Sequence, residues 1–118
     1  MKLVHYRLLP DHSVEPVDVS STERLMSWAQ EWGGMDKRVA FTEVAPGITV
    51  STVFLGIDHS FMRHGPPLLF ETMVFDDYGS NDCWRYATWD DAAAGHESVV
   101  KGLERSIAKL PKKVIQTP

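Results

Sequence analysis

The chain has 118 residues, of which 43% are hydrophobic, so it can bury one core but not two, and we expect a single domain over residues 1–118. Its one cysteine, Cys83, excludes an intrachain disulfide, which is typical of a reducing compartment. No apolar run approaches the roughly 20 residues of a membrane span, so we expect no membrane partner.

The net charge of −4 is unevenly distributed. Residues 1–98 contain 7 basic and 15 acidic side chains, a net of −8, whereas residues 99–118 contain 5 basic and 1 acidic, a net of +4. The acidic part would repel a phosphate backbone, so nucleic acid is not an expected partner. The basic end either contacts an acidic partner or complements the dipole of a helix C-terminus.

The N-terminal third predicts short strands followed by a helix. Residues 3–19 contain Pro10 and Pro16 and are typical of one or two edge strands, because proline donates no ladder hydrogen bond. Ser20 and Glu23 then form a capping-box pattern that predicts a helix start. The pair 33–34, two glycines, predicts its end. One apolar stripe runs along this helix: Leu25, Trp28, Ala29 and Trp32.

The middle of the chain predicts antiparallel strands. Residues 39–44 and 48–57 flank Pro46 and Gly47, a hairpin pattern. Residues 68–75 are apolar on nearly every position, which predicts a central strand covered on both faces. A fourth strand is expected over residues 84–88, after an exposed hairpin loop.

A second helix is predicted after Thr88, which fits an N-cap with Asp91 three residues later. Apolar residues recur at three- and four-residue steps to about Leu110, and Pro111 stops the run. Gly95 and Gly102 lie near one line of this helix and predict a close neighbour. The fold class is therefore α+β, an antiparallel sheet of four or more strands packed against two helices. The expected core contains Trp28, Trp32, Phe54, Phe70, Val99 and Leu103.

The connection of residues 58–67 is longer than an ordinary hairpin loop and mixes charged, histidine and apolar residues, as binding loops do. We therefore predict binding through Phe61, Met62, Arg63 and His64. A metal site would use Asp58, His59 and His64, with Glu71 or His96. Their spacing matches no metal motif, so we predict no metal ion and no cofactor.

Four polar residues are candidates for catalysis, in a small hydrolase or nuclease. They are Asp58 and His59 at a strand end, Glu71 within an apolar strand and His96 on the apolar side of the second helix. Each also has a structural interpretation. A carboxylate at Glu71 must pair, for example with Arg63 or Arg85, and a histidine on an apolar helix face is more often a hydrogen-bonded core residue.

Three segments, residues 50–61, 65–75 and 85–97, resemble a family of small proteins encoded by tailed bacteriophages and prophages. The resemblance covers roughly residues 38–100. It implies a phage context and the host cytoplasm, and it transfers no catalytic residue because the family has no established activity. Members often carry a glycine-rich stretch where this chain has Met62, Arg63 and His64.

Together these observations favour a phage accessory protein that binds a host or phage macromolecule, with inhibition of a host system as one such role. We expect a binder rather than an enzyme. The hydrolase or nuclease is the alternative, and an assembly component that acts as a homo-oligomer is a third interpretation. An enzyme requires the polar candidates to converge in one pocket, whereas a binder requires an exposed apolar patch.

Overall fold

The computed structural model describes residues 4–58, 60, 65–77 and 82–109. Within them, two helices and six strands form an α+β fold. A hairpin of β1 (His5–Leu8) and β2 (Val14–Val17) precedes α1 (Thr22–Gly34). An antiparallel four-stranded sheet follows, in the order β3 (Arg38–Ala45), β4 (Ile48–Phe54), β5 (Phe70–Phe75) and β6 (Cys83–Tyr86). Helix α2 (Trp89–Ala108) ends the described chain, so the predicted fold class is confirmed.

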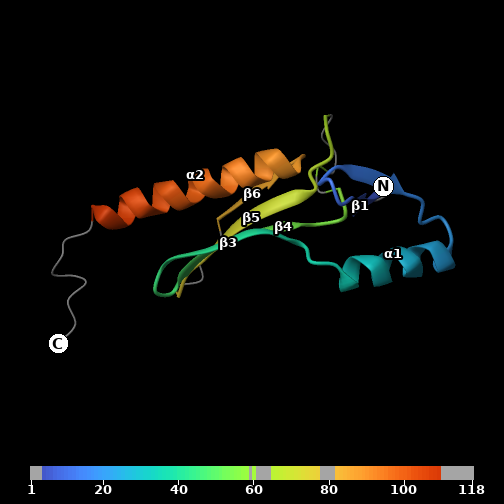
Figure 1. Cartoon of the computed structure of the whole chain (residues 1–118), viewed down its shortest axis with the longest axis horizontal. Helices are drawn as coiled ribbons and strands as arrows, with labels where there is room; N and C mark the ends of the chain where they lie inside the picture. Colours follow the sequence, from blue (N-terminus) through green and yellow to red (C-terminus); the bar gives the residue numbers. More distant parts are fainter. Residues whose placement is uncertain (1–3, 59, 61–64, 78–81, 110–118) are drawn as a thin grey trace.

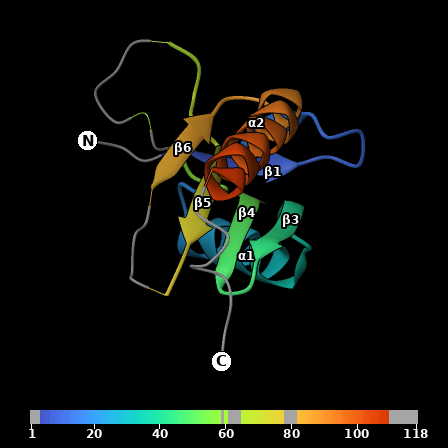
Figure 2. The same cartoon turned by 90° about the vertical axis from the view of Figure 1, so that its left-hand side faces the viewer.

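The two helices relate to the four-stranded sheet in different ways. Helix α2 lies along one face of the sheet, whereas α1 lies beyond the end of the strands (Figure 1). Seen along the long axis, α2 lies over the sheet and α1 lies behind it (Figure 2). The β1–β2 hairpin joins the chain just after β4, since Tyr6 donates its backbone N–H to the carbonyl of Gly56 at 2.8 Å. The sequence predicted these edge strands but not their partner.

Local signals explain where the elements begin and end. Gly47 has φ +80° in the β3–β4 turn, which glycine adopts without strain, so the predicted hairpin is confirmed. The predicted cap of α1 is wrong by one residue. Ser21 Oγ accepts from the backbone N–H of Arg24 at 3.2 Å, because the backbone of Ser20 is bound instead by the Asp18 carboxylate at 2.8 Å.

Helix α1 ends at Gly34, as predicted, but not by the predicted mechanism. Neither Gly33 nor Gly34 has a positive φ, and the helix ends where Met35 turns to an extended conformation. Helix α2 begins as expected, with Thr88 Oγ1 accepting from the backbone N–H of Asp91 at 3.1 Å.

The core lies between α2 and the facing side of the sheet. One cluster contains Phe54, Leu69, Phe70 and Ala92, and a second contains Val50, Val74 and Val100. Among the residues predicted to be buried, Trp28, Phe54 and Phe70 are buried. Trp32, Val99 and Leu103 are only partly buried, because they lie at the margins of these clusters.

The two faces of the sheet are unequally covered. On β5, Phe70, Thr72 and Val74 are buried, whereas Glu71 and Met73 are half-buried and Phe75 is exposed. Successive strand residues point to opposite faces, so within the described residues the side facing α2 is the covered one. The prediction that this strand is covered on both faces is therefore wrong. We call the covered side the inner face and the opposite side the outer face.

Candidate functional site

Asp58 closes the long connection between β4 and β5. One of its carboxylate oxygens, Oδ1, accepts from the backbone N–H of Ser60 at 2.8 Å and from that of Leu68 at 2.9 Å. A single side chain therefore ties the two ends of the connection together. His59 and the predicted binding residues lie outside the described residues: Phe61, Met62, Arg63 and His64.

His96 lies in the core, on α2, facing the inner face of the sheet. It is 1% exposed. Its Nδ1 is 2.8 Å from Thr52 Oγ1 and its Nε2 is 2.9 Å from Thr42 Oγ1, and the Thr52 hydroxyl is 2.6 Å from that of Thr72. Hydroxyls both donate and accept, so a neutral imidazole is satisfied at both nitrogens. Burial lowers the pKa of His96, and the nearby charge of Glu97 opposes this shift only in part.

Glu71 lies on the opposite side of the sheet from His96. Its Oε2 accepts from Arg85 Nε at 2.9 Å, across the β5–β6 pair in which these residues are direct neighbours. The adjacent residue, Thr72, points to the inner face and belongs to the histidine network. The sheet therefore separates Glu71 from His96, and the structure does not bring these two candidates together. The expected ion pair of Glu71 is formed, with Arg85.

The part of the chain that the structure describes contains no group of three or more His, Cys, Asp or Glu side chains that could hold a metal ion. Two of the candidate ligands, His59 and His64, lie outside it. Asp58 accepts hydrogen bonds from backbone N–H groups. His96 forms hydrogen bonds with threonine hydroxyls. No helix among the described residues is long and apolar enough to cross a membrane.

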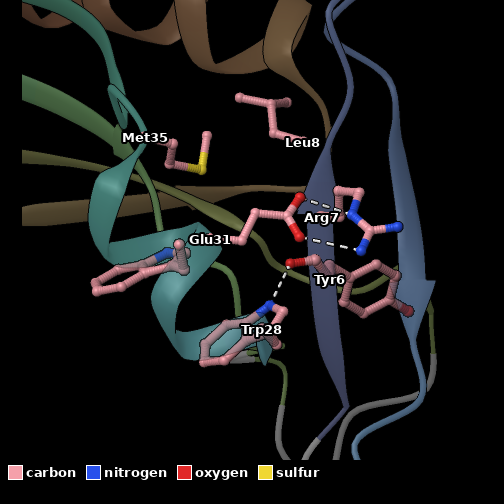
Figure 3. Close-up of a pocket in the computed structure, with 7 residues that line it drawn as sticks. Tyr6, Arg7, Leu8, Trp28, Glu31 and Met35 are labelled. Atoms are coloured by element: carbon pink, nitrogen blue, oxygen red, sulfur yellow. Dashed lines mark hydrogen bonds and ion pairs between the residues drawn. The ribbon is translucent and has the colours of Figure 1, made fainter. Parts of the chain in front are cut away.

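A small cavity separates α1 from β1 (Figure 3). Its volume is about 10 Å³, enough for roughly one water molecule. Trp28 Nε1 donates to the carbonyl of Tyr6 at 2.9 Å, and Arg7 holds Glu31 through two hydrogen bonds of 2.7 and 3.0 Å. The cavity is therefore a packing junction that attaches α1 to the hairpin. Its lining residues are Tyr6, Arg7, Leu8, Trp28, Glu31, Trp32 and Met35.

The tip of the β1–β2 hairpin rests on the start of α2. His12 has φ +72° and stacks on Trp89, with ring centroids 3.6 Å apart. The turn is closed by hydrogen bonds between Leu9 and Ser13 and between His12 and Leu9. Two open hollows flank it, of about 220 Å³ and 340 Å³, and the first is lined by Trp89 and by five polar residues: Asp11, His12, Ser13, Thr88 and Asp90. This contact was not predicted, since nothing in the sequence places the hairpin against α2.

The outer face carries two exposed aromatic side chains, whereas the exposed Trp84 pairs with Thr72 and therefore lies on the inner-face side of the edge strand β6. Phe41 is 48% exposed and Phe75 is 45% exposed. Strand register places Phe41, Ser51, Met73 and Cys83 in one row across all four strands, because directly paired residues share a face. Phe75 lies in the next row, beside Thr49. The centre of the face thus carries apolar side chains on β3, β5 and β6, with the polar Ser51 between them on β4.

The ends of the outer face are charged. One end carries the Glu71–Arg85 ion pair and Arg38, whose guanidinium lies over the Phe41 ring at 4.7 Å. The other end carries Glu43, which pairs with Thr49 in the ladder. Within the described residues, neither the Arg38 nor the Glu43 side chain has an ion-pair partner.

The chain matches no protein-family model, no curated protein and no solved structure.

Proposed function

We propose that this chain is a bacteriophage-encoded accessory protein that acts in the host cytoplasm by binding a host or phage protein through the outer face of its sheet. The observation that carries the proposal is a pair of exposed aromatic residues: Phe41 lies in a row that also contains Met73 and Cys83, and Phe75 lies in the next row. Inhibition of a host system is one consequence that such binding would have.

The position of this apolar surface supports a contact with protein. Single exposed apolar residues are common on soluble proteins, but a contiguous group with a polar rim is typical of an interaction surface. Here the apolar residues lie on β3, β5 and β6 on both sides of Ser51 and Thr49, and charged residues lie at both ends of the face: Arg38, Glu43, Glu71 and Arg85. Among the described residues, no helix lies over this side of the strands at the end away from α1 (Figure 1).

The polar candidates support binding over catalysis. His96 is enclosed by threonine hydroxyls, and Glu71 is paired on the other side of the sheet, so these two do not share a pocket. General acid–base catalysis requires a donor and an acceptor within reach of one substrate. The phage context rests on the resemblance of residues 38–100 and is part of the proposal.

Photo-crosslinking in infected host cells tests the outer face as a contact surface. A photoreactive phenylalanine analogue at position 75 should form a covalent protein adduct, whose identity is read by mass spectrometry. The same analogue at Leu25, which is 40% exposed on α1, is the matched control. Adducts of equal yield at both positions, or none at position 75, would contradict the proposal.

A further inference from the structure

We infer that the protein which covers the outer face is a second copy of this chain, stacked face to face about a two-fold axis that runs across the strands. This inference rests on the proposed function, because it names the partner of the same surface. It is carried by the distribution of charge on β3 together with the apolar row at the centre of the face.

Two charges of the outer face that have no ion-pair partner among the described residues lie at its two ends. Arg38 is level with Val53 at one end of the sheet, and Glu43 is level with Thr49 at the other, with Phe41 between them. A two-fold rotation across the strands reverses the strand direction and places β3 over β3 of the second copy. Arg38 of each copy then faces Glu43 of the other, and the two Phe41 rings meet near the axis.

The other two-fold arrangement is unfavourable. Rotation about an axis parallel to the strands keeps their direction and places β3 over β6 of the second copy. Arg38 would then face Arg85, since both belong to the row that contains Val53 and Glu71. Like charges placed opposite each other cost affinity, so the charge pattern selects the reversed arrangement.

The shape of the molecule fits the reversed stack. Helix α1 lies beyond one end of the outer face (Figure 1), so a reversed copy carries its own α1 beyond the opposite end. Two packed sheets lie about 10 Å apart, a distance that arginine and glutamate side chains can span together. The central row of each copy then packs against the same row of the other, with Met73 against Met73 of the second copy.

The size of the face predicts a reversible dimer. Strands about 4.8 Å apart with a rise of about 3.3 Å per residue give a sheet of this size roughly 20 Å by 15 Å. That is about 300 Å² per copy, below the size of standard stable interfaces, so association should be weak and depend on concentration. The dimer should therefore appear as the protein concentration is raised, as a self-association that sedimentation velocity resolves.

A matched pair of methionine variants tests which surface is used. Met73→Lys places a lysine opposite its own copy at the centre of the face and should weaken dimerisation about tenfold or more. Met26→Lys, at a 56% exposed position on α1, should leave it unchanged. A dimer could also form by pairing the edge strand β3 of two copies. Met73 lies on the central strand β5, so Met73→Lys would leave such an edge-paired dimer intact. A wild-type protein that stays monomeric, or a dimer unaffected by Met73→Lys, would overturn the inference.

A charge exchange tests the orientation even if Met73→Lys does not fold. Arg38→Glu and Glu43→Arg should each dimerise about tenfold less tightly alone, since each meets a like charge. Mixed together, the two variants should form a heterodimer, in which every pair is again of opposite sign. Failure of the mixture to associate would overturn the reversed stack. A monomeric wild type that still gives a heavier adduct at position 75 would overturn this inference while the proposed function stands.

Discussion

The inner face of the sheet satisfies its buried polar groups with hydrogen bonds, whereas the outer face leaves apolar side chains exposed to water. On the inner face His96, Thr52 and Thr72 are deeply buried and Thr42 is partly buried, yet each polar side-chain atom of this network has a partner. On the outer face, Phe41 and Phe75 remain exposed to water, and neither belongs to a cluster of the core. Buried polar groups that are paired contribute to a unique fold, whereas exposed apolar groups gain stability only when something covers them.

This difference changes which residues deserve a functional interpretation. His96 is a chemically versatile residue, but its surroundings on α2 are those of a core position. Phe75 has no chemistry of its own, but it is a large apolar side chain on the solvated face of an antiparallel sheet, where polar residues are typical. The outer face is therefore where a partner would change the free energy of the molecule most.

The largest expected effect compares two phenylalanines from opposite faces. Phe54→Ala removes a side chain that is 1% exposed at the centre of the core and should lower the free energy of unfolding by about 3–5 kcal/mol. Phe75→Ala, at 45% exposure, should lower it by less than about 1 kcal/mol. Chemical denaturation of dilute protein measures both. Equal losses would show that the outer face is also covered within one chain.

The next effect compares the polar residues of the two faces. His96→Ala leaves the hydroxyls of Thr42 and Thr52 without their buried partner and should cost about 1–3 kcal/mol of stability. Glu71→Gln weakens a partly exposed ion pair with Arg85 and should cost less than about 1 kcal/mol. Thermal and chemical unfolding of both variants measure the difference. A His96→Ala protein as stable as the parent would contradict the structural role of the network.

The histidine network also predicts a dependence of stability on pH. Because burial lowers the pKa of His96 in the folded state below its ordinary value of 6.5, the unfolded chain takes up this proton first as the pH falls. The free energy of unfolding should therefore fall as the pH drops through the unfolded-state pKa, and this loss should stop below the folded-state pKa. Its slope is at most about 1.4 kcal/mol per pH unit.

A pair of asparagine variants isolates the contribution of His96. His96→Asn should flatten the dependence on pH between neutral and mildly acidic solution, because its side chain does not titrate. The matched control is His12→Asn, the same substitution at a histidine on the exposed tip of the β1–β2 hairpin. Melting temperatures measured across this range for the three proteins check the prediction. An unchanged slope in His96→Asn would locate the titration elsewhere.

Much of the fold could be predicted because its signals are local. The turn at Gly47 and the cap at Thr88 each depend on residues within four positions, and both are as expected. The cap of α1 moved to Ser21 because Asp18, just outside the pattern, competes for the backbone of Ser20. Trp32 is less buried than predicted. The spacing of apolar residues along a helix predicts which residues share a face, but not what that face packs against.

The candidate site could be predicted less well because it depends on register. The sequence placed Glu71 on a strand and His96 on a helix, but the side of the sheet on which each lies follows from pairing with β4 and from the position of α2. The same limit hid the outer face. Phe41 and Phe75 are 34 positions apart in sequence, and only the paired rows through Ser51 and Thr49 bring them to one surface.

The smallest expected effect compares two glycines of α2, the helix that covers the inner face. A methyl group at Gly102 would meet no atom within 4 Å, so Gly102→Ala should raise the free energy of unfolding by about 0.5–1 kcal/mol through better helix propensity. At Gly95 the same group would lie 2.3 Å from Tyr86 Oη, so the ring must move before Gly95→Ala gains anything. The predicted close neighbour of these glycines therefore exists at Gly95 alone. Chemical denaturation should show a gain for Gly102→Ala and a smaller gain or a loss for Gly95→Ala. Equal gains in both variants would mean that the Tyr86 ring moves without lowering the free energy of unfolding. The close contact between α2 and β6 would then add nothing to stability.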